Sequence, residues 1–218
     1  MGTVSSFEKS PTMRPLLLVH GTYGRSTGWH KPSSNLWTAL ESKGFTPIEF
    51  LWSGWCGGIP SPVIVSPDTD DLKGSLRLWQ SEGEKLALFC QRLGLEAPDV
   101  ISHSHGLQIV AFAASGVGGL CLAQTFGTVL SLSGPVRQDM AWVRDRAKSH
   151  IRRWVQVYDP VGDLTIREGE AFDGEVGWHY ALPEADVNVE ARGQGHSGLC
   201  TDVQAWGRLG LWQHFNAP

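Results

Sequence analysis

The residues with the clearest chemical potential lie in the segment Ser102-His103-Ser104-His105-Gly106, between an extended run and a helical one. In an α/β sheet, ligands bind beyond the carboxyl ends of the strands, and a serine on the tight turn before a helix is exposed there as a nucleophile. Such a turn requires small residues two positions before and after the serine, because strand and helix pack closely around it. Ser102 and Gly106 meet that requirement, although glycine is usual at the first position. The segment therefore predicts that Ser104 is a nucleophile.

A nucleophilic serine needs a base, and the base needs a carboxylate that orients it. In an open α/β sheet these two groups follow the serine in the chain, with the acid before the histidine. His196 stands in the glycine-flanked segment GQGHSG, which favours a loop that can reach the serine. For the acid, we favour Asp159 because it comes directly after the predicted strand 152–158. Asp163 stays as the alternative, and its other interpretation is a residue that caps the next segment or holds the loop.

The negatively charged oxygen of an acyl-transfer transition state needs hydrogen-bond donors. One predicted donor is the backbone N–H of His105, the residue after the nucleophile. The other is expected in the turn HGTYG at 20–24, which follows the first buried strand, with the Thr22 N–H as the donor. We assign the neighbouring Tyr23 to the substrate contacts.

The two histidines beside the serine also allow a metal-dependent hydrolase as an alternative. His103 and His105 would face the same side of a regular strand, and His20 and Asp159 could complete a ligand set. The serine between them is expected at a tight turn, where that geometry is lost. The chain, at 218 residues, is also short for a full barrel of alternating strands and helices, which has about 250 residues. We therefore expect no metal ion, and keep a non-catalytic binding module on the same scaffold as a further alternative.

The composition is that of a folded chain with moderate charge. Hydrophobic residues make up 41% of the sequence and charged residues 18%, which excludes a disordered chain. The formal net charge of −4 gives no electrostatic reason to expect nucleic acid or an anionic membrane as a partner. Residues 1–13 are polar and lack the apolar core of a secretory signal, and no apolar run is long enough to span a membrane. We expect a cytoplasmic protein with a disordered lead-in at 1–13.

Strands alternate with helices along the chain, which predicts a doubly wound, mostly parallel α/β sheet with helices on both faces. The continuous apolar run PLLLVHGTYG, from Pro15, is typical of a strand buried on both faces. Apolar residues that recur at steps of three and four from Leu72 to Leu93 predict a helix. Strands are predicted near 15–20, 46–52, 98–104, 125–134, 152–158 and 187–191, and helices near 33–44, 72–94, 105–115, 138–149 and 200–215. All of them belong to a single domain over 14–218.

One segment, 53–71, breaks this alternation and is rich in glycine and proline. A structureless segment of this length is uncommon in a compact domain and is usually functional or disordered. It carries apolar side chains that would cost free energy if they were left in water. Because it starts at the same sheet edge as Ser104, we interpret it as a flap in which Trp55 and Ile59 form part of an acyl pocket for short or medium chains. The alternative is that it simply covers the edge of the sheet.

Together these segments resemble an α/β-hydrolase of the lipase and esterase kind. LLLVHGTYG resembles the strand and turn of the oxyanion hole, SHSHG the nucleophile elbow, YDPVGD the turn of the acid, and GHSG the histidine loop. The Asp-x-Val order in YDPVGD matches the family at Asp159. The resemblance covers roughly Pro15 to Phe215, and the chain is similar to the compact members, which lack a large inserted cap. It implies serine-dependent hydrolysis of a small carboxylic ester through an acyl-enzyme, with no cofactor. Thioesters, amides and acyl transfer use the same machinery and stay open.

Overall fold

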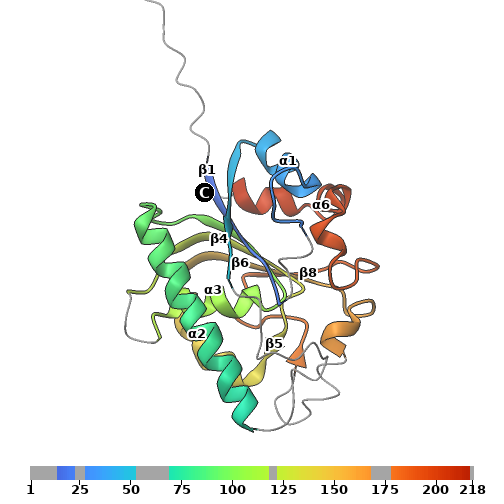
Figure 1. Ribbon diagram of the computed structural model, residues 1–218. Helices are drawn as coiled ribbons and strands as arrows, with labels where there is room; N and C mark the ends of the chain where they lie inside the picture. The colour runs from blue at the N-terminus through green and yellow to red at the C-terminus, as the bar shows by residue number, and fades with distance from the viewer. Residues whose placement is uncertain (1–13, 23–27, 53–68, 118–121, 168–177, 217–218) are drawn as a thin grey trace, which may run out of the picture.

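The chain folds around one parallel sheet of six strands. The computed structural model describes residues 14–22, 28–52, 69–117, 122–167 and 178–216 (Figure 1). The strands stand in the order β2-β1-β3-β4-β6-β8, and every neighbouring pair is parallel. Their bounds are Arg14–Val19 for β1, Phe45–Phe50 for β2, Asp99–His103 for β3, Phe126–Leu132 for β4, Ile151–Tyr158 for β6 and Val187–Glu190 for β8. The strand order reverses between β1 and β3, which is the point where sheets of this kind bind their ligands.

Helices cover both faces of the sheet (Figure 1). One apolar cluster joins the sheet to α2 (Thr69–Arg92), α3 (Gly106–Ser115) and α4 (Ala141–Lys148). A second cluster, on the other face, joins it to α1 (Asn35–Ser42), α6 (Val203–Arg208) and the 3₁₀ helix η5 (Leu211–Asn216). The predicted doubly wound α/β architecture is therefore confirmed.

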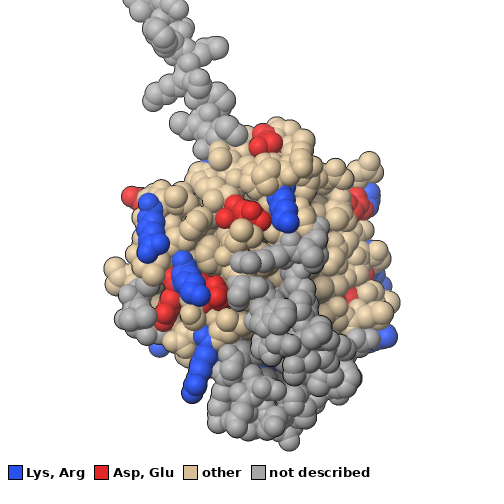
Figure 2. Space-filling model, in the orientation of Figure 1, with Lys and Arg blue, Asp and Glu red and all other residues tan. Residues whose placement is uncertain are grey.

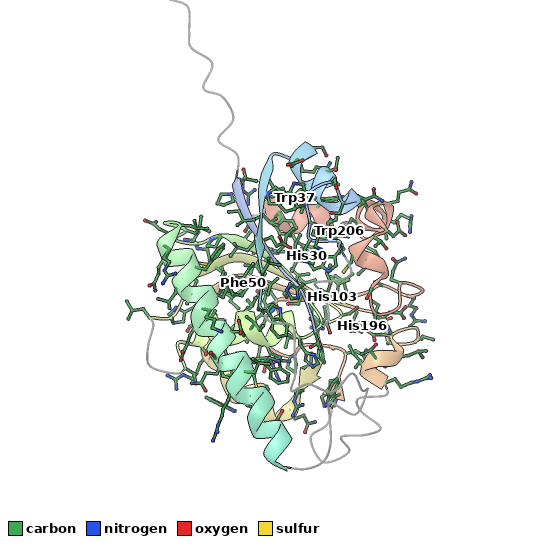
Figure 3. The ribbon with its side chains drawn as sticks, viewed as in Figure 1. His30, Trp37, Phe50, His103, His196 and Trp206 are labelled. Atoms are coloured by element: carbon green, nitrogen blue, oxygen red, sulfur yellow. The ribbon has the colours of Figure 1, made fainter. Side chains whose placement is uncertain are left out.

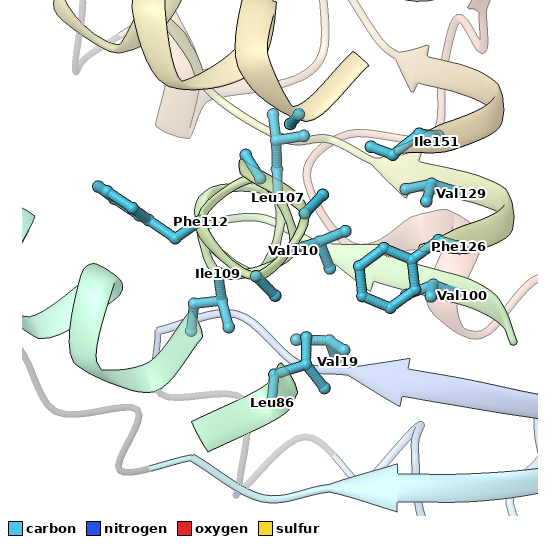
Figure 4. Packing of buried hydrophobic residues seen from close by; sticks show 14 of the residues in the cluster. Val19, Leu86, Val100, Leu107, Ile109, Val110, Phe112, Phe126, Val129 and Ile151 are labelled. Atoms are coloured by element: carbon cyan, nitrogen blue, oxygen red, sulfur yellow. The ribbon is translucent and has the colours of Figure 1, made fainter. Parts of the chain in front are cut away.

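The helix that follows Ser104 is the one most deeply placed in the core. Every residue of α3 is buried. Figure 4 shows α3 end-on, with Leu86 of α2 and Val19 of β1 together on one side and Val100 and Val129 of the sheet on another. Burying one such side chain stabilises a protein by roughly 1.5–3 kcal/mol. The core thus fixes the amino end of α3, and with it the turn at Ser104.

Two elements differ from the predicted ones. Helix α2 begins at Thr69, so the last three residues of the predicted flap are helical, while 53–68 lies outside the described residues, as does the predicted lead-in. The closing helix predicted near 200–215 consists of three short helices, which are η4 (Gly198–Cys200), α6 and η5. Gly210 lies between the last two with φ 65°, and this left-handed conformation ends α6.

A small antiparallel pair of strands stands apart from the main sheet and was not predicted. It joins β5 (Val136–Arg137) to β7 (Trp178–His179), with Arg137 opposite Trp178. These strands are too short to form a stable unit alone, so their place depends on packing against the rest of the domain.

Charged side chains of both signs are mixed on the face of the molecule that carries α2 (Figure 2). On α2, Lys85 forms an ion pair with the largely buried Glu82, with 2.9 Å between Nζ and Oε1. On that face the described residues do not build the single-sign field that attracts nucleic acid. Over the described part of the chain, none of the helices combines the length and the apolar character needed to span a bilayer.

Candidate active site

Ser104 sits in a strained turn between β3 and α3. Its φ is 52°, in the left-handed region that residues other than glycine rarely adopt. Backbone hydrogen bonds hold the turn on both sides, since the Ser104 N–H donates to the Leu132 carbonyl at 3.0 Å and the Leu107 N–H donates to the Ser104 carbonyl at 3.1 Å. Strain of this kind costs about 1–3 kcal/mol and persists where the surroundings fix it, typically at functional sites. The turn places Ser104 at the carboxyl end of β3.

Small residues allow β1, β3 and α3 to meet at this turn. A Cβ on Gly106 would lie 2.6 Å from the Val19 carbonyl oxygen, and a Cβ on Gly21 would lie 2.5 Å from the Cβ of Ser104. Ser102 is fully buried. The need for small residues two positions before and after Ser104 therefore has a direct steric cause, and Gly21 is a third position with the same need.

His196 pairs with a carboxylate at the same edge of the sheet. Its Nδ1 lies 3.0 Å from both carboxylate oxygens of Asp163. Asp163 is fully buried, whereas the His196 side chain keeps 20% of its surface exposed. The Asp163 carboxylate also accepts the Ile166 N–H at 3.2 Å, so it caps the following turn as well. This geometry holds the imidazole with its Nδ1–H toward the acid and leaves Nε2 free to accept a proton.

The carboxylate at the His196 ring is that of Asp163, whereas Asp159, the acid favoured from the sequence, binds backbone N–H groups. One Asp159 oxygen accepts the N–H groups of Val161 and Gly162 at 3.0 and 2.8 Å, and the other accepts the Gly195 N–H at 2.8 Å. Burial raises the pKa of Asp159, but these amide donors outweigh it and hold the pKa below its ordinary value. Asp159 is thus an ionised anchor that ties the turn after β6 to the loop of His196.

His103, the residue before Ser104, is hydrogen-bonded to the loop that carries His196. Its Nε2–H donates to the His196 carbonyl at 2.9 Å, and the two rings lie 4.9 Å apart, close together at the end of β3 in Figure 3. Burial, and then the neighbouring His196, lower the pKa of His103 to about 3. The ring is therefore neutral at ordinary pH, and it fixes the position of the base loop beside Ser104.

The side chains of Thr22 and His105, the two predicted oxyanion-hole residues, are hydrogen-bonded to each other. Thr22 Oγ1 and His105 Nδ1 lie 2.8 Å apart. The His105 ring also stacks on Trp79 of α2, with 5.0 Å between ring centroids. Sequence reasoning missed Trp79 at this site, because its spacing along α2 marks it only as a core residue.

The histidines around Ser104 make separate contacts and do not converge on one point. The Nδ1–H of His20 donates to the Gly21 carbonyl at 2.8 Å, while His103 and His105 have the partners given above. Among the residues that the structure describes, no group of three or more His, Cys, Asp or Glu side chains is arranged to hold a metal ion. The described residues therefore give the metal-dependent alternative no support.

The predicted substrate contacts Tyr23, Trp55 and Ile59 lie outside the described residues. A cavity of about 730 Å³ lies at the opposite edge of the sheet, where Arg14 and Asp99 begin β1 and β3. It does not border Ser104, so we assign it no part in the chemistry.

Buried neutral histidines, among them His103 and His105, are expected to make the fold sensitive to acid. In an unfolded chain histidine titrates near pH 6.5, whereas in the fold the pKa values of His103 and His105 are both about 3. Between these limits the unfolded chain binds protons that the folded chain cannot bind, so the free energy of unfolding falls as the pH falls. We expect a lower urea midpoint at about pH 5 than at about pH 7.5, above the range in which carboxylates titrate. His103→Gln should make this loss smaller. A midpoint that stays constant over this range would contradict the expectation.

No protein-family model matches the sequence, and no curated protein is detectably similar to it. Solved structures share the fold. A predicted CIB-like hydrolase from Thermoplasma acidophilum aligns with 99% of this chain and 90% of its own, with a TM-score of 0.55 and 15% identity. A structure from work on carboxylesterases of the thaumarchaeon Nitrososphaera gargenis aligns with 94% of this chain and 91% of its own, with a TM-score of 0.51 and 11% identity. At these identities the likeness shows the fold alone, and the chain has the α/β-hydrolase fold.

Proposed function

We propose that this protein is a serine hydrolase that cleaves carboxylic esters with Ser104 as nucleophile, His196 as base and Asp163 as the acid that orients it. The observation that carries the proposal is that a strained serine turn and a pair formed by His196 and the buried Asp163 carboxylate lie at one edge of the sheet. The hydrogen bond from His103 to the His196 carbonyl supports it, because it holds the base loop next to the residue that precedes Ser104.

In the proposed reaction, Ser104 Oγ attacks the carbonyl carbon of the ester while His196 Nε2 accepts the hydroxyl proton. The Nδ1–H of His196 donates to Asp163, which keeps the imidazole in the tautomer with a free Nε2 and stabilises the imidazolium that forms. The backbone N–H groups of Thr22 and His105 donate to the oxyanion of the tetrahedral intermediate.

The intermediate then collapses into an acyl-enzyme. The bond between the carbonyl carbon and the leaving oxygen breaks, and the imidazolium of His196 gives its proton to that oxygen, so that an alcohol leaves. A water molecule attacks the acyl group with His196 again as the base, and Ser104 regains its proton when the carboxylic acid is released. No cofactor or metal ion takes part in these steps.

We propose an ester over an amide as the substrate, because an alkoxide leaves a tetrahedral intermediate more readily than an amine anion does. The solved structure from the work on Nitrososphaera gargenis carboxylesterases has the same fold, so the fold is compatible with ester hydrolysis. The proposed acyl group is of short or medium length.

A panel of p-nitrophenyl esters from acetate to palmitate tests the proposal. We expect the purified protein to hydrolyse them, with kcat/KM highest for acyl chains between acetate and octanoate. EDTA should leave the rate unchanged, which separates a serine mechanism from the metal-dependent alternative. Failure to hydrolyse any ester of the panel, or a loss of rate in EDTA that a metal ion restores, would exclude the proposed function.

A further inference from the structure

The imidazole of His105 is held by three elements that are distant in the sequence. It stacks on Trp79 of α2 with ring planes 25° apart, and it meets Trp178 of β7 edge-on, with 6.1 Å between centroids. Its Nδ1 is bonded to Thr22 Oγ1, in the turn after β1, at 2.8 Å. The ring therefore has a fixed position that does not depend on the backbone of its own turn.

A buried arginine braces the two indole rings. The Arg137 guanidinium carbon lies 5.7 Å from the ring centroids of both Trp79 and Trp178. The Arg137 side chain is only 2% exposed, and it forms two hydrogen bonds with the Asp139 carboxylate at 3.0 and 2.8 Å. A cation between two aromatic faces stabilises such an arrangement by about 0.5–2 kcal/mol. The support on which the His105 ring rests is thus rigid.

The environment also keeps the His105 ring neutral. Burial, and then the positive charge of Arg137, lower the pKa of His105 to about 3. A neutral imidazole has one donor and one acceptor, and the Thr22 hydroxyl is both, so the bond forms with either tautomer. It therefore persists over the whole pH range in which an esterase is assayed.

We infer that the His105 side chain is a positioning residue, which holds the Thr22 turn so that the Thr22 N–H points at the oxyanion. This inference rests on the proposed function. The bond joins two residues 83 positions apart, and these are the two residues whose N–H groups are proposed as donors. Gly21 already lies against Ser104 with no room for a Cβ, so one side of the turn is set by contact and the other by His105. An oxyanion hole works only when its donors stand within about 2.7–3.1 Å of the developing charge. The hydrogen bond between His105 and Thr22 therefore affects catalysis, because it holds the Thr22 N–H at that distance.

Two substitutions at position 105 separate the effect of the hydrogen bond to Thr22 from the effect of the ring packing. His105→Phe keeps an aromatic ring against Trp79 and removes the hydrogen bond, whereas His105→Asn offers a polar atom close to the position of Nδ1. We expect His105→Phe to lower kcat about tenfold to a hundredfold, less than or equal to the loss of a whole oxyanion donor, with KM nearly unchanged. His105→Asn should recover most of that loss.

Substitutions of Thr22, the other residue of this hydrogen bond, give the second test. Thr22→Val keeps the backbone N–H and removes the hydroxyl, and it should reproduce the His105→Phe loss. Thr22→Ser, which restores the hydroxyl, should recover most of that loss. Because Thr22→Val and His105→Phe remove the same hydrogen bond, the variant with both substitutions should be no slower than the slower of the two single variants. The affinity for a trifluoromethyl ketone, which forms an oxyanion on the serine, should fall by the same factor as kcat, and urea unfolding should confirm that each variant is folded.

Three results would overturn the inference in a folded protein. They are an unchanged kcat in His105→Phe, equal losses in His105→Phe and His105→Asn, and losses that multiply in the double variant. A wild-type protein that hydrolyses no ester would overturn the proposed function itself, and this inference with it.

Discussion

Replacing Ser104 with alanine is expected to lower kcat for ester hydrolysis by about 10⁴ to 10⁶, because no acyl-enzyme can form without the hydroxyl. Initial rates on p-nitrophenyl butyrate, measured against the uncatalysed rate, give this factor directly. Ser115→Ala is a matched control, since Ser115 is a second serine that is 6% exposed, at the far end of the helix that Ser104 precedes. That variant should keep the wild-type rate. Activity of Ser104→Ala within about tenfold of wild type would exclude Ser104 as the nucleophile.

A glycine variant separates the loss of the nucleophile from a loss of folding. Ser104 has φ 52°, which glycine adopts without strain. Ser104→Gly should therefore be as inactive as Ser104→Ala, with a urea midpoint at or above that of the alanine variant. Inactivity in a glycine variant that is folded in the absence of urea and unfolds cooperatively cannot be attributed to unfolding.

Asp163→Asn is expected to lower kcat by about 10⁴, because an amide at this position favours the wrong imidazole tautomer of His196. Asp163 has both oxygens 3.0 Å from His196 Nδ1, so the substitution changes the proton donor–acceptor pattern and leaves the shape of the site almost intact. The rate should be measured at the pH optimum of the wild type. A kcat close to wild type would show that another group orients the base.

Asp159→Asn should act mainly on stability. The Asp159 carboxylate accepts three backbone N–H groups, and an amide retains only part of this capacity, so we expect a loss of about 1–3 kcal/mol in the free energy of unfolding. Its effect on kcat should be far smaller than that of Asp163→Asn, because Asp159 holds the base loop through Gly195 and does not touch the imidazole. If Asp159→Asn were the slower of the two enzymes, the roles that we assign to the aspartates would be reversed.

The sequence alone predicts the fold and the place of the serine. The apolar runs of β1 and β3 and the small residues around Ser104 are local signals, and each has a direct structural cause. Val100 and Ile101 are fully buried in the sheet, and a Cβ on Gly106 would lie 2.6 Å from the Val19 carbonyl oxygen of β1. Such signals are strong because a strand buried on both faces tolerates few residue types.

The choice between the two aspartates could not be made from distance along the chain. Both lie in one turn after β6, and the fold of that turn, with the Asp163 N–H donating to the Asp159 carbonyl at 3.2 Å, decides which carboxylate reaches His196. One local signal is consistent with the contacts that the two aspartates make. Asp159 is followed by Pro, Val and Gly, and aspartate before such residues commonly bonds the backbone N–H two positions on, as Asp159 does with Val161.

The contacts of His105 could not be predicted from the sequence. Its ring meets side chains from α2, β7 and the turn after β1, and only the packing of these elements brings them together. Trp79 shows the limit most clearly, because its place on the apolar stripe of α2 is equally consistent with a plain core residue.

The most direct test of the central claim is to map the site at which a fluorophosphonate attaches. The reagent labels an activated serine covalently, and peptide mass spectrometry identifies the modified residue. We predict a single adduct on the peptide that contains Ser104, formed rapidly in the wild-type protein, slowly in Asp163→Asn and not at all in Ser104→Ala. An unlabelled wild-type protein, or an adduct that persists on another residue in Ser104→Ala, would contradict the proposal that Ser104 is the nucleophile.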